Sequence, residues 1–85
     1  MWSAQHIRHF APENYITSAG FGTMGFGLPA AVGVAKARPQ DPVILITGDG
    51  SFMMNIQELG SIKRGQLPIK ILLLDNQRLG MVRQW

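Results

Sequence analysis

Two runs of mostly apolar residues dominate the hydrophobic pattern of this 85-residue chain. The first run is Val43-Ile44-Leu45-Ile46-Thr47, and the second extends from Ile69 to Leu74. Continuous apolar runs rich in β-branched residues are typical of parallel strands that are buried on both faces. The pattern therefore predicts two central strands of a parallel sheet.

Stretches with a helical pattern alternate with these strands. We expect helices over residues 2–10, 26–37 and 52–64, a short strand over residues 15–18, and the first turn of another helix over residues 81–85. This alternation, without a hairpin signal, is typical of a parallel sheet with helices on both faces. The predicted fold class is therefore α/β, with three layers (α/β/α) and a parallel sheet.

The composition suggests that this fold is not complete in itself. Hydrophobic residues make up 46% of the chain and charged residues 15%, which is apolar for so short a soluble domain. We therefore expect faces that need cover from elsewhere, and we interpret residues 1–85 as part of a larger domain.

Charge and cysteine content exclude several classes of function. The net charge of +3 comes from basic residues scattered along the chain, so we expect no nucleic-acid-binding patch. No apolar run approaches the ~20 residues of a membrane span, and the chain does not open on a signal-peptide pattern. The chain has no cysteine. These features fit a cytoplasmic protein that binds neither nucleic acid nor membrane.

Two short polar motifs follow the two predicted strands. Gly48-Asp49-Gly50 ends the first run, and Asp75-Asn76 ends the second. Ligands collect at the carboxyl ends of parallel strands. A carboxylate and an amide oxygen that meet there could hold a divalent cation such as Mg²⁺ and leave room for a diphosphate.

Two alternatives stay open for these motifs. Gly-Asp-Gly is also an ordinary turn in which Asp49 caps the following helix. Asp75 competes with Asn76 as the second ligand, because neighbouring strand residues point to opposite sides and only one of the two can face Asp49.

The glycine-rich segment before residue 26 suggests a different kind of site. Residues Gly20 to Gly25 match the G-x-G-x-x-G pattern of dinucleotide-binding proteins. Such a site needs an acidic residue at the end of the next strand, about 20 positions further on. Asp41 lies at the wrong end of that strand, and Asp49 already belongs to the metal motif, so we do not favour this interpretation.

Together these motifs resemble those of a known family. Gly48-Asp49-Gly50 followed by Asp75-Asn76 is similar to the thiamine-diphosphate motif, GDG followed by NN, with Asp75 in place of the first asparagine. The segments Gly22–Ala31 and Gly80–Trp85 resemble the large catalytic subunit of acetohydroxyacid (acetolactate) synthase. Residues 49–54 and 75–80 are most similar to the bacterial isozyme II type. The resemblance implies that residues 1–85 form part of the C-terminal thiamine-diphosphate-binding domain of that family.

The resemblance also implies metal and cofactor ligands. Asp49 and Asn76 would bind Mg²⁺ through their side chains, and Arg78 through its backbone carbonyl. The residues expected to contact thiamine diphosphate are Gly22, Met24, Gly50, Ser51 and Met81. Within this set, Gly50 and Ser51 would meet the diphosphate, and the Met24 side chain would hold the cofactor bent.

Met81 and Trp85 would line the substrate entrance. The glutamate that activates the cofactor would come from another domain of the partner subunit, so we expect no catalytic residue in this chain. We interpret Met53 and Met54 as core filling, and His6 and His9 as surface residues rather than metal ligands.

The full enzyme implied by this resemblance is a transferase of isoleucine and valine biosynthesis. It would decarboxylate pyruvate and join the remaining two-carbon unit to a second 2-oxo acid, such as pyruvate or 2-oxobutyrate. The resemblance implies a homodimer of catalytic subunits, a small regulatory subunit, and room for FAD outside this segment. We expect the isolated chain to be inactive. The alternatives are another thiamine-diphosphate enzyme of the pyruvate oxidase or decarboxylase group, and a non-catalytic truncated module.

Overall fold

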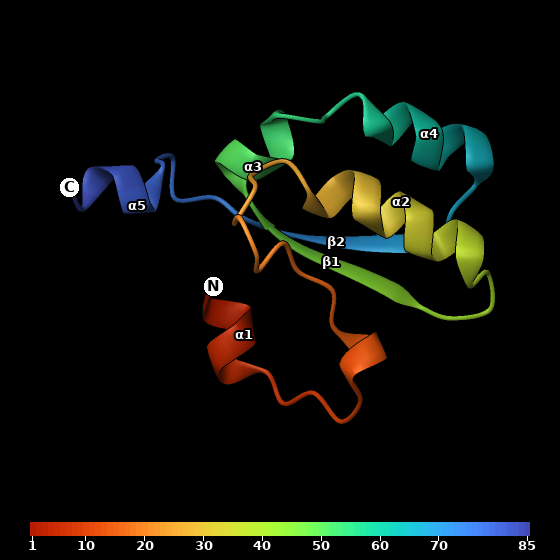
Figure 1. Cartoon of the computed structure of the whole chain (residues 1–85). Coiled ribbons are helices and arrows are strands. Elements are labelled where there is room, and N and C mark those ends of the chain that lie inside the picture. The colour runs from red at the N-terminus through yellow and green to blue at the C-terminus, as the bar shows by residue number, and fades with distance from the viewer.

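The computed structural model describes residues 1–85 and contains helices on a small parallel sheet (Figure 1). The elements in chain order are α1 (Trp2–His6), η1 (Pro12–Asn14), α2 (Gly27–Ala37), β1 (Val43–Gly48), α3 (Asp49–Met53), α4 (Glu58–Gly65), β2 (Ile69–Leu74) and α5 (Gly80–Arg83). The predicted α/β class with a parallel sheet is confirmed.

The two apolar runs form the two strands of the sheet. β1 and β2 pair in parallel, with Val43 opposite Ile69 and Gly48 opposite Leu74. Because this register aligns their last residues, the chain leaves both strands at the same edge of the sheet. Figure 1 shows both strands ending on the side where α3 lies.

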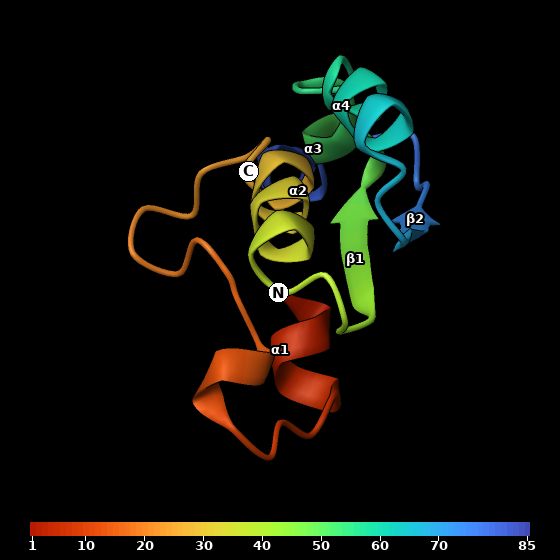
Figure 2. The ribbon, with the colours of Figure 1, turned by 90° about the vertical axis from the view of Figure 1, so that its right-hand side faces the viewer.

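Helices α2 and α4 pack together over one face of this sheet (Figure 2). The small residues of α2 allow its backbone to approach β1 closely. The buried core consists of Leu28, Ala31, Ala35, Val43 and Leu45. Ile62 from α4 and Ile71 from β2 extend this core.

The other face of the sheet is open within these 85 residues. Ile44 is 65% exposed, and Leu72 is 51% exposed. The chain thus supplies the sheet and the helices on one of its faces, whereas we expected helices on both. Covering the second face requires apolar surface that these residues do not provide.

Three predicted elements differ in the structure. No strand forms over residues 15–18, because they are not paired with β1 or β2 in the sheet. The helix expected over residues 52–64 is divided into α3 and α4 by turns at residues 54–57. The helix expected over residues 2–10 stops at His6 as α1.

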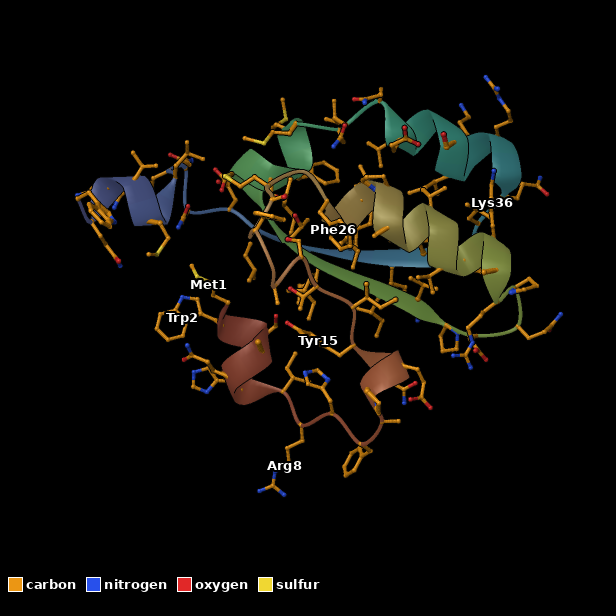
Figure 3. All side chains as sticks on the ribbon, in the orientation of Figure 1. Met1, Trp2, Arg8, Tyr15, Phe26 and Lys36 are labelled. Carbon is orange, nitrogen blue, oxygen red and sulfur yellow. The ribbon has the colours of Figure 1, made fainter.

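The N-terminal segment forms its own small cluster below the sheet (Figure 3). The Tyr15 hydroxyl lies 3.2 Å from the Ser3 hydroxyl, within hydrogen-bond distance. His6 stacks on Trp2, and His9 packs against Tyr15. The two histidines therefore have separate aromatic neighbours, which fits the surface interpretation.

No helix in the chain has the length and apolar character needed to cross a membrane.

Candidate functional site

The site is built where the two strands end. Asp49 is the first residue of α3, directly after β1, and Asp75-Asn76 directly follow β2. Because Gly48 and Leu74 lie opposite each other, the two polar motifs start from neighbouring positions. The structure therefore brings the two motifs to one edge of the sheet, as the sequence predicted.

The carboxylate of Asp49 has no partner within the chain. Gly48 occupies the N-cap position of α3, and the helix has no side-chain cap. The alternative role of Asp49 as a capping residue is therefore not realised. Asp49 is half-buried. The other two aspartates have partners, since Asp41 pairs with Arg38 and Asp75 accepts a hydrogen bond.

The loop after β2 is held by two turns that its own side chains stabilise. Asp75 accepts a hydrogen bond from the Gln77 backbone N–H at 2.9 Å, and Asn76 accepts one from the Arg78 N–H at 3.2 Å. Such bonds between Asx side chains and the backbone two residues on define local turns. The loop therefore has a definite shape, with Gln77 at a positive φ of 55°.

The alternation along this loop distinguishes Asn76 from Asp75. A broad, open hollow extends over about half of the chain, from the N-terminal segment to the strand ends, and its lining includes Asp49, Asn76 and Arg78 but neither Asp75 nor Gln77. The Asn76 carbonyl oxygen has a second lone pair beyond the one that accepts from Arg78. Of the two candidates at the end of β2, Asn76 is thus the one that faces the hollow, as Asp49 does.

Three segments of the chain converge on Gly50. A Cβ atom at this position would lie 2.5 Å from Leu79 Cδ2 and 3.4 Å from Met24 Cε. Gly50 therefore packs between the glycine-rich loop and the loop after β2, and a side chain at this position would require Leu79 to move. The convergence places Met24 and Leu79 beside the strand ends.

Gly25 attaches the glycine-rich loop to α3 and to the turn that follows α3. The Gly25 backbone N–H donates to Ser51 Oγ at 2.9 Å, and its carbonyl accepts from Asn55 Nδ2 at 2.7 Å. Gly25 is buried and has a φ of 82°, which favours glycine. Ser51, a predicted cofactor contact, thus also has a structural bond.

Asn55 is the residue that the sequence analysis missed. It was placed within one continuous helix over residues 52–64, where an asparagine would face solvent. The chain instead turns after Met53, and the Asn55 side chain reaches the glycine-rich loop. A signal was present, because asparagine in a helix interior often makes bonds that compete with the helix.

The remaining predicted residues lie around the same hollow or beyond it. Gly22, at a φ of 66°, and Met81 both belong to its lining. Trp85 is fully exposed and forms a separate shallow apolar pocket with Met81 and Val82. Helix α5 extends away from the body of the molecule (Figure 1). The structure therefore places Met81 at the site and Trp85 outside it.

Two further expectations concern methionines and metal ligands. Met53 and Met54 are 61% and 52% exposed, so their assignment to the core is wrong for this chain. They lie where α3 ends and the chain turns outward.

No three His, Cys, Asp or Glu side chains gather anywhere in the chain. A cation at Asp49 would therefore meet one carboxylate, with amide and backbone oxygens as its other protein ligands.

Comparison with known proteins agrees with these features. The sequence model of the family described as "Thiamine pyrophosphate enzyme, C-terminal TPP binding domain" matches residues 1–85. Over the same 85 residues the chain is 75% identical to the acetolactate synthase isozyme 2 large subunit of Escherichia coli. It is 58% identical to chloroplastic acetolactate synthase 2 of Nicotiana tabacum and 54% identical to the chloroplastic enzyme of Arabidopsis thaliana.

These alignments cover all of this chain but a small part of each relative. The chain corresponds to 16% of the length of the bacterial subunit and 13% of the two plant proteins. The resemblance to isozyme II of acetolactate synthase, expected from the motifs, is confirmed.

Proposed function

This chain belongs to the family of C-terminal TPP-binding domains of thiamine pyrophosphate (thiamine diphosphate) enzymes, and from that premise we propose that it is part of the catalytic subunit of an acetolactate synthase. The full enzyme would decarboxylate pyruvate and transfer the two-carbon unit to a second 2-oxo acid. The proposal is supported by the relatives to which this chain is similar, because they are named as acetolactate synthases in a bacterium and in plants.

The proposed metal ligands are Asp49, Asn76 and the backbone carbonyl of Arg78. One observation carries this proposal: the parallel register of β1 and β2 brings a half-buried Asp49 carboxylate without a partner to the edge of the sheet where Asn76 and Arg78 follow β2. These three are oxygen donors, which Mg²⁺ prefers, and they leave coordination positions for diphosphate oxygens and water. The donor set therefore fits the metal that the family resemblance implies.

The proposed diphosphate contacts are Gly50 and Ser51. The Gly50 backbone is covered by the Met24 and Leu79 side chains, and the 44% exposed Leu79 would move aside for a ligand. The Ser51 oxygen already accepts a hydrogen bond from Gly25. Its O–H is thus left to donate, and a diphosphate oxygen is a suitable acceptor.

The proposed contacts with the rings of the cofactor come from the two flanking loops. Gly22 and Met24 would meet the aminopyrimidine and the thiazolium, and Met81 would approach from α5. Met24 is 42% exposed and Met81 is 49% exposed, so both have apolar surface available for a ligand. Met81 and Trp85 would also line the path by which substrate enters.

The bound thiamine diphosphate would supply the carbon nucleophile that decarboxylation of a 2-oxo acid requires. The residues of this chain would bind the metal and diphosphate, orient the rings and exclude water. The chain contains two glutamates, Glu13 and Glu58, and neither belongs to a proposed contact. The activating carboxylate would come from the partner subunit.

We further propose the partners and setting of the full enzyme. It would act as a homodimer of catalytic subunits with a small regulatory subunit, in the cytoplasm, and would accept pyruvate or 2-oxobutyrate as the second substrate. FAD, if bound, would lie outside this segment. The large exposed apolar side chains of the open sheet face and of α5 support contacts with further protein surface.

Two alternatives differ in a measurable way. Another thiamine-diphosphate enzyme of the pyruvate oxidase or decarboxylase group would bind the same cofactor but release acetyl phosphate or an aldehyde. A non-catalytic module would bind no cofactor. The relatives named above support the synthase over both.

The experiment uses a host enzyme, in which this sequence replaces the matching 85 residues of the E. coli isozyme 2 large subunit, co-expressed with its small subunit. We expect acetolactate to form from pyruvate at a rate within about tenfold of the natural enzyme. A folded host enzyme that binds cofactor but releases acetaldehyde would favour a decarboxylase. A folded host enzyme without activity or cofactor binding would overturn the proposal.

A further inference from the structure

Asn55 provides a connection between the two parts of the proposed cofactor site. It lies in the turn between α3 and α4, and it does not line the hollow at the strand ends. Its amide nitrogen donates to the Gly25 carbonyl at 2.7 Å across 30 residues of sequence. Asn55 therefore bonds to the glycine-rich loop without reaching the proposed ligand positions.

The orientation of this amide is fixed by a second bond. Gln57 Nε2 lies 3.1 Å from Asn55 Oδ1 and donates to it. With its oxygen accepting from Gln57, the Asn55 amide presents its nitrogen to Gly25. The pair thus selects the donor that the Gly25 carbonyl needs.

Gly25 is the point where the loop is attached. It is buried, and both of its backbone polar groups pair with side chains of the segment after β1, at Ser51 and Asn55. The other bonds of the loop are local, from the Gly22 N–H to the Ser18 carbonyl and from the Ser18 hydroxyl to the Thr23 carbonyl. Nothing local therefore fixes the position of the loop relative to Gly50.

Gly25 also leaves little space for an alternative arrangement. A Cβ at Gly25 would lie 2.8 Å from Asn55 Nδ2 and 3.1 Å from Met54 Cβ. Met24, the preceding residue, packs toward Gly50. A shift of Gly25 would therefore move the Met24 side chain relative to the strand ends.

We propose that Asn55 is a positioning residue, which acts through the Gly25 carbonyl to set Met24 and Gly22 against the ring end of the bound cofactor. This inference rests on the proposed function. It predicts a division of effects: loss of Asn55 disturbs the ring end, while the metal and diphosphate end at Asp49 and Gly50 stays intact.

The test compares Asn55→Ala and Asn55→Asp in the host enzyme. Asn55→Asp keeps the shape but replaces the donor by an oxygen that faces the Gly25 carbonyl, and an unsatisfied buried carbonyl has a cost. We expect kcat to fall about tenfold, equivalent to ~1.4 kcal/mol of transition-state stabilisation. The dissociation constant for thiamine diphosphate should change less than threefold. The near-ultraviolet circular dichroism of the bound cofactor, which reports ring orientation, should change.

Gly60→Ala is the control, because it lies in α4 shortly after this turn, a Cβ there meets no atom within 4 Å, and the bonds from Gln57 to Asn55 and from Asn55 to Gly25 stay in place. We expect its kcat to stay within about twofold of the host enzyme. Unchanged kcat in both Asn55 variants would overturn the inference. Equal loss of kcat and cofactor affinity, together with a lower melting temperature, would also overturn it, because that pattern indicates general destabilisation. An unsubstituted host enzyme without activity would overturn the proposed function, and the inference with it.

Discussion

At the scale of single residues, the difference between the three aspartates carries most of the functional argument. Asp41 pairs with Arg38, Asp75 stabilises a turn, and Asp49 has no partner. A partly exposed carboxylate that no protein group engages keeps its oxygens available to a cation. The sequence motif predicted this aspartate, and its surroundings explain why it is available to a cation.

Part of the site could not be predicted at this scale. The sequence left Asp75 and Asn76 as alternatives, because a strand pattern alone does not show at which residue the strand ends. Side-chain directions alternate only up to that residue. The two turns after Leu74 decide which side chain faces the hollow. Asn55 was missed because its bond joins positions 30 residues apart.

Substitution at the end of β2 should separate these two residues. In the host enzyme, Asn76→Ala should weaken binding of thiamine diphosphate with Mg²⁺ about tenfold or more, since it removes a metal ligand. Asp75→Asn keeps a side-chain oxygen for the turn and should change affinity less than threefold. Calorimetric titration measures both. The reverse order of effects would assign the ligand to Asp75.

Gly50 offers a steric test of the same site. Gly50→Ala would place a Cβ against Leu79 and Met24, so we expect the affinity for thiamine diphosphate to fall about tenfold, because overpacking of one methyl group costs ~1–3 kcal/mol. Gly60→Ala is the control, because no atom lies within 4 Å of a Cβ there. Gly60 lies in helix α4, so Gly60→Ala should raise the melting temperature slightly. Equal affinities in both variants would contradict the close packing at Gly50.

At the scale of elements, the strands were the most predictable part of the fold. The run from Ile69 to Leu74 corresponds to β2, and β1 extends the first run by one residue to Gly48. Apolar runs bounded by turn residues have few other solutions. Residues 15–18 have strand-like character too, but a strand needs a paired neighbour, and these residues pair with neither β1 nor β2.

The division of the predicted helix 52–64 has a tertiary cause. The turns at residues 54–57 contain shorter-range backbone bonds, such as Glu58 N–H to the Asn55 carbonyl. At the same place the Asn55 side chain bonds to Gly25. Asn55 is a weak helix former, but the contact of its side chain with a distant loop explains why α3 ends before this residue.

Packing of α2 on the sheet should matter for stability. Leu28 belongs to α2, is 2% exposed, and lies in the buried core that this helix forms with β1. Leu28→Ala should destabilise the host enzyme by about 2–5 kcal/mol, as large-to-small core substitutions do, and thermal unfolding should show a lower midpoint. Gly33→Ala on the same helix meets no atom within 4 Å and should not lower the midpoint. An unchanged midpoint for Leu28→Ala would contradict the assigned core.

At the scale of the whole molecule, the chain is rich in uncovered apolar surface. Eight of its 85 residues are buried, and one face of the sheet is open. Short chains gain little stability from so small a core. The composition predicted this need for cover, although it did not indicate which face would remain open.

The isolated chain should therefore not work as an enzyme. We expect no acetolactate from pyruvate with the purified 85-residue chain at saturating cofactor and Mg²⁺, and a broad thermal transition without cooperativity. The host enzyme assayed in parallel is the positive control. Turnover by the isolated chain would mean that the chain supplies every group that the reaction needs.

The central claim is that Asp49 helps to hold the metal that binds the diphosphate of the cofactor. Calorimetric titration of thiamine diphosphate into the Mg²⁺-saturated host enzyme tests it most directly, with Asp49→Asn compared against Asp41→Asn, whose aspartate pairs with Arg38 away from the strand ends. The account predicts at least tenfold weaker binding for Asp49→Asn and unchanged binding for Asp41→Asn. Unchanged affinity in the folded Asp49→Asn enzyme would contradict it.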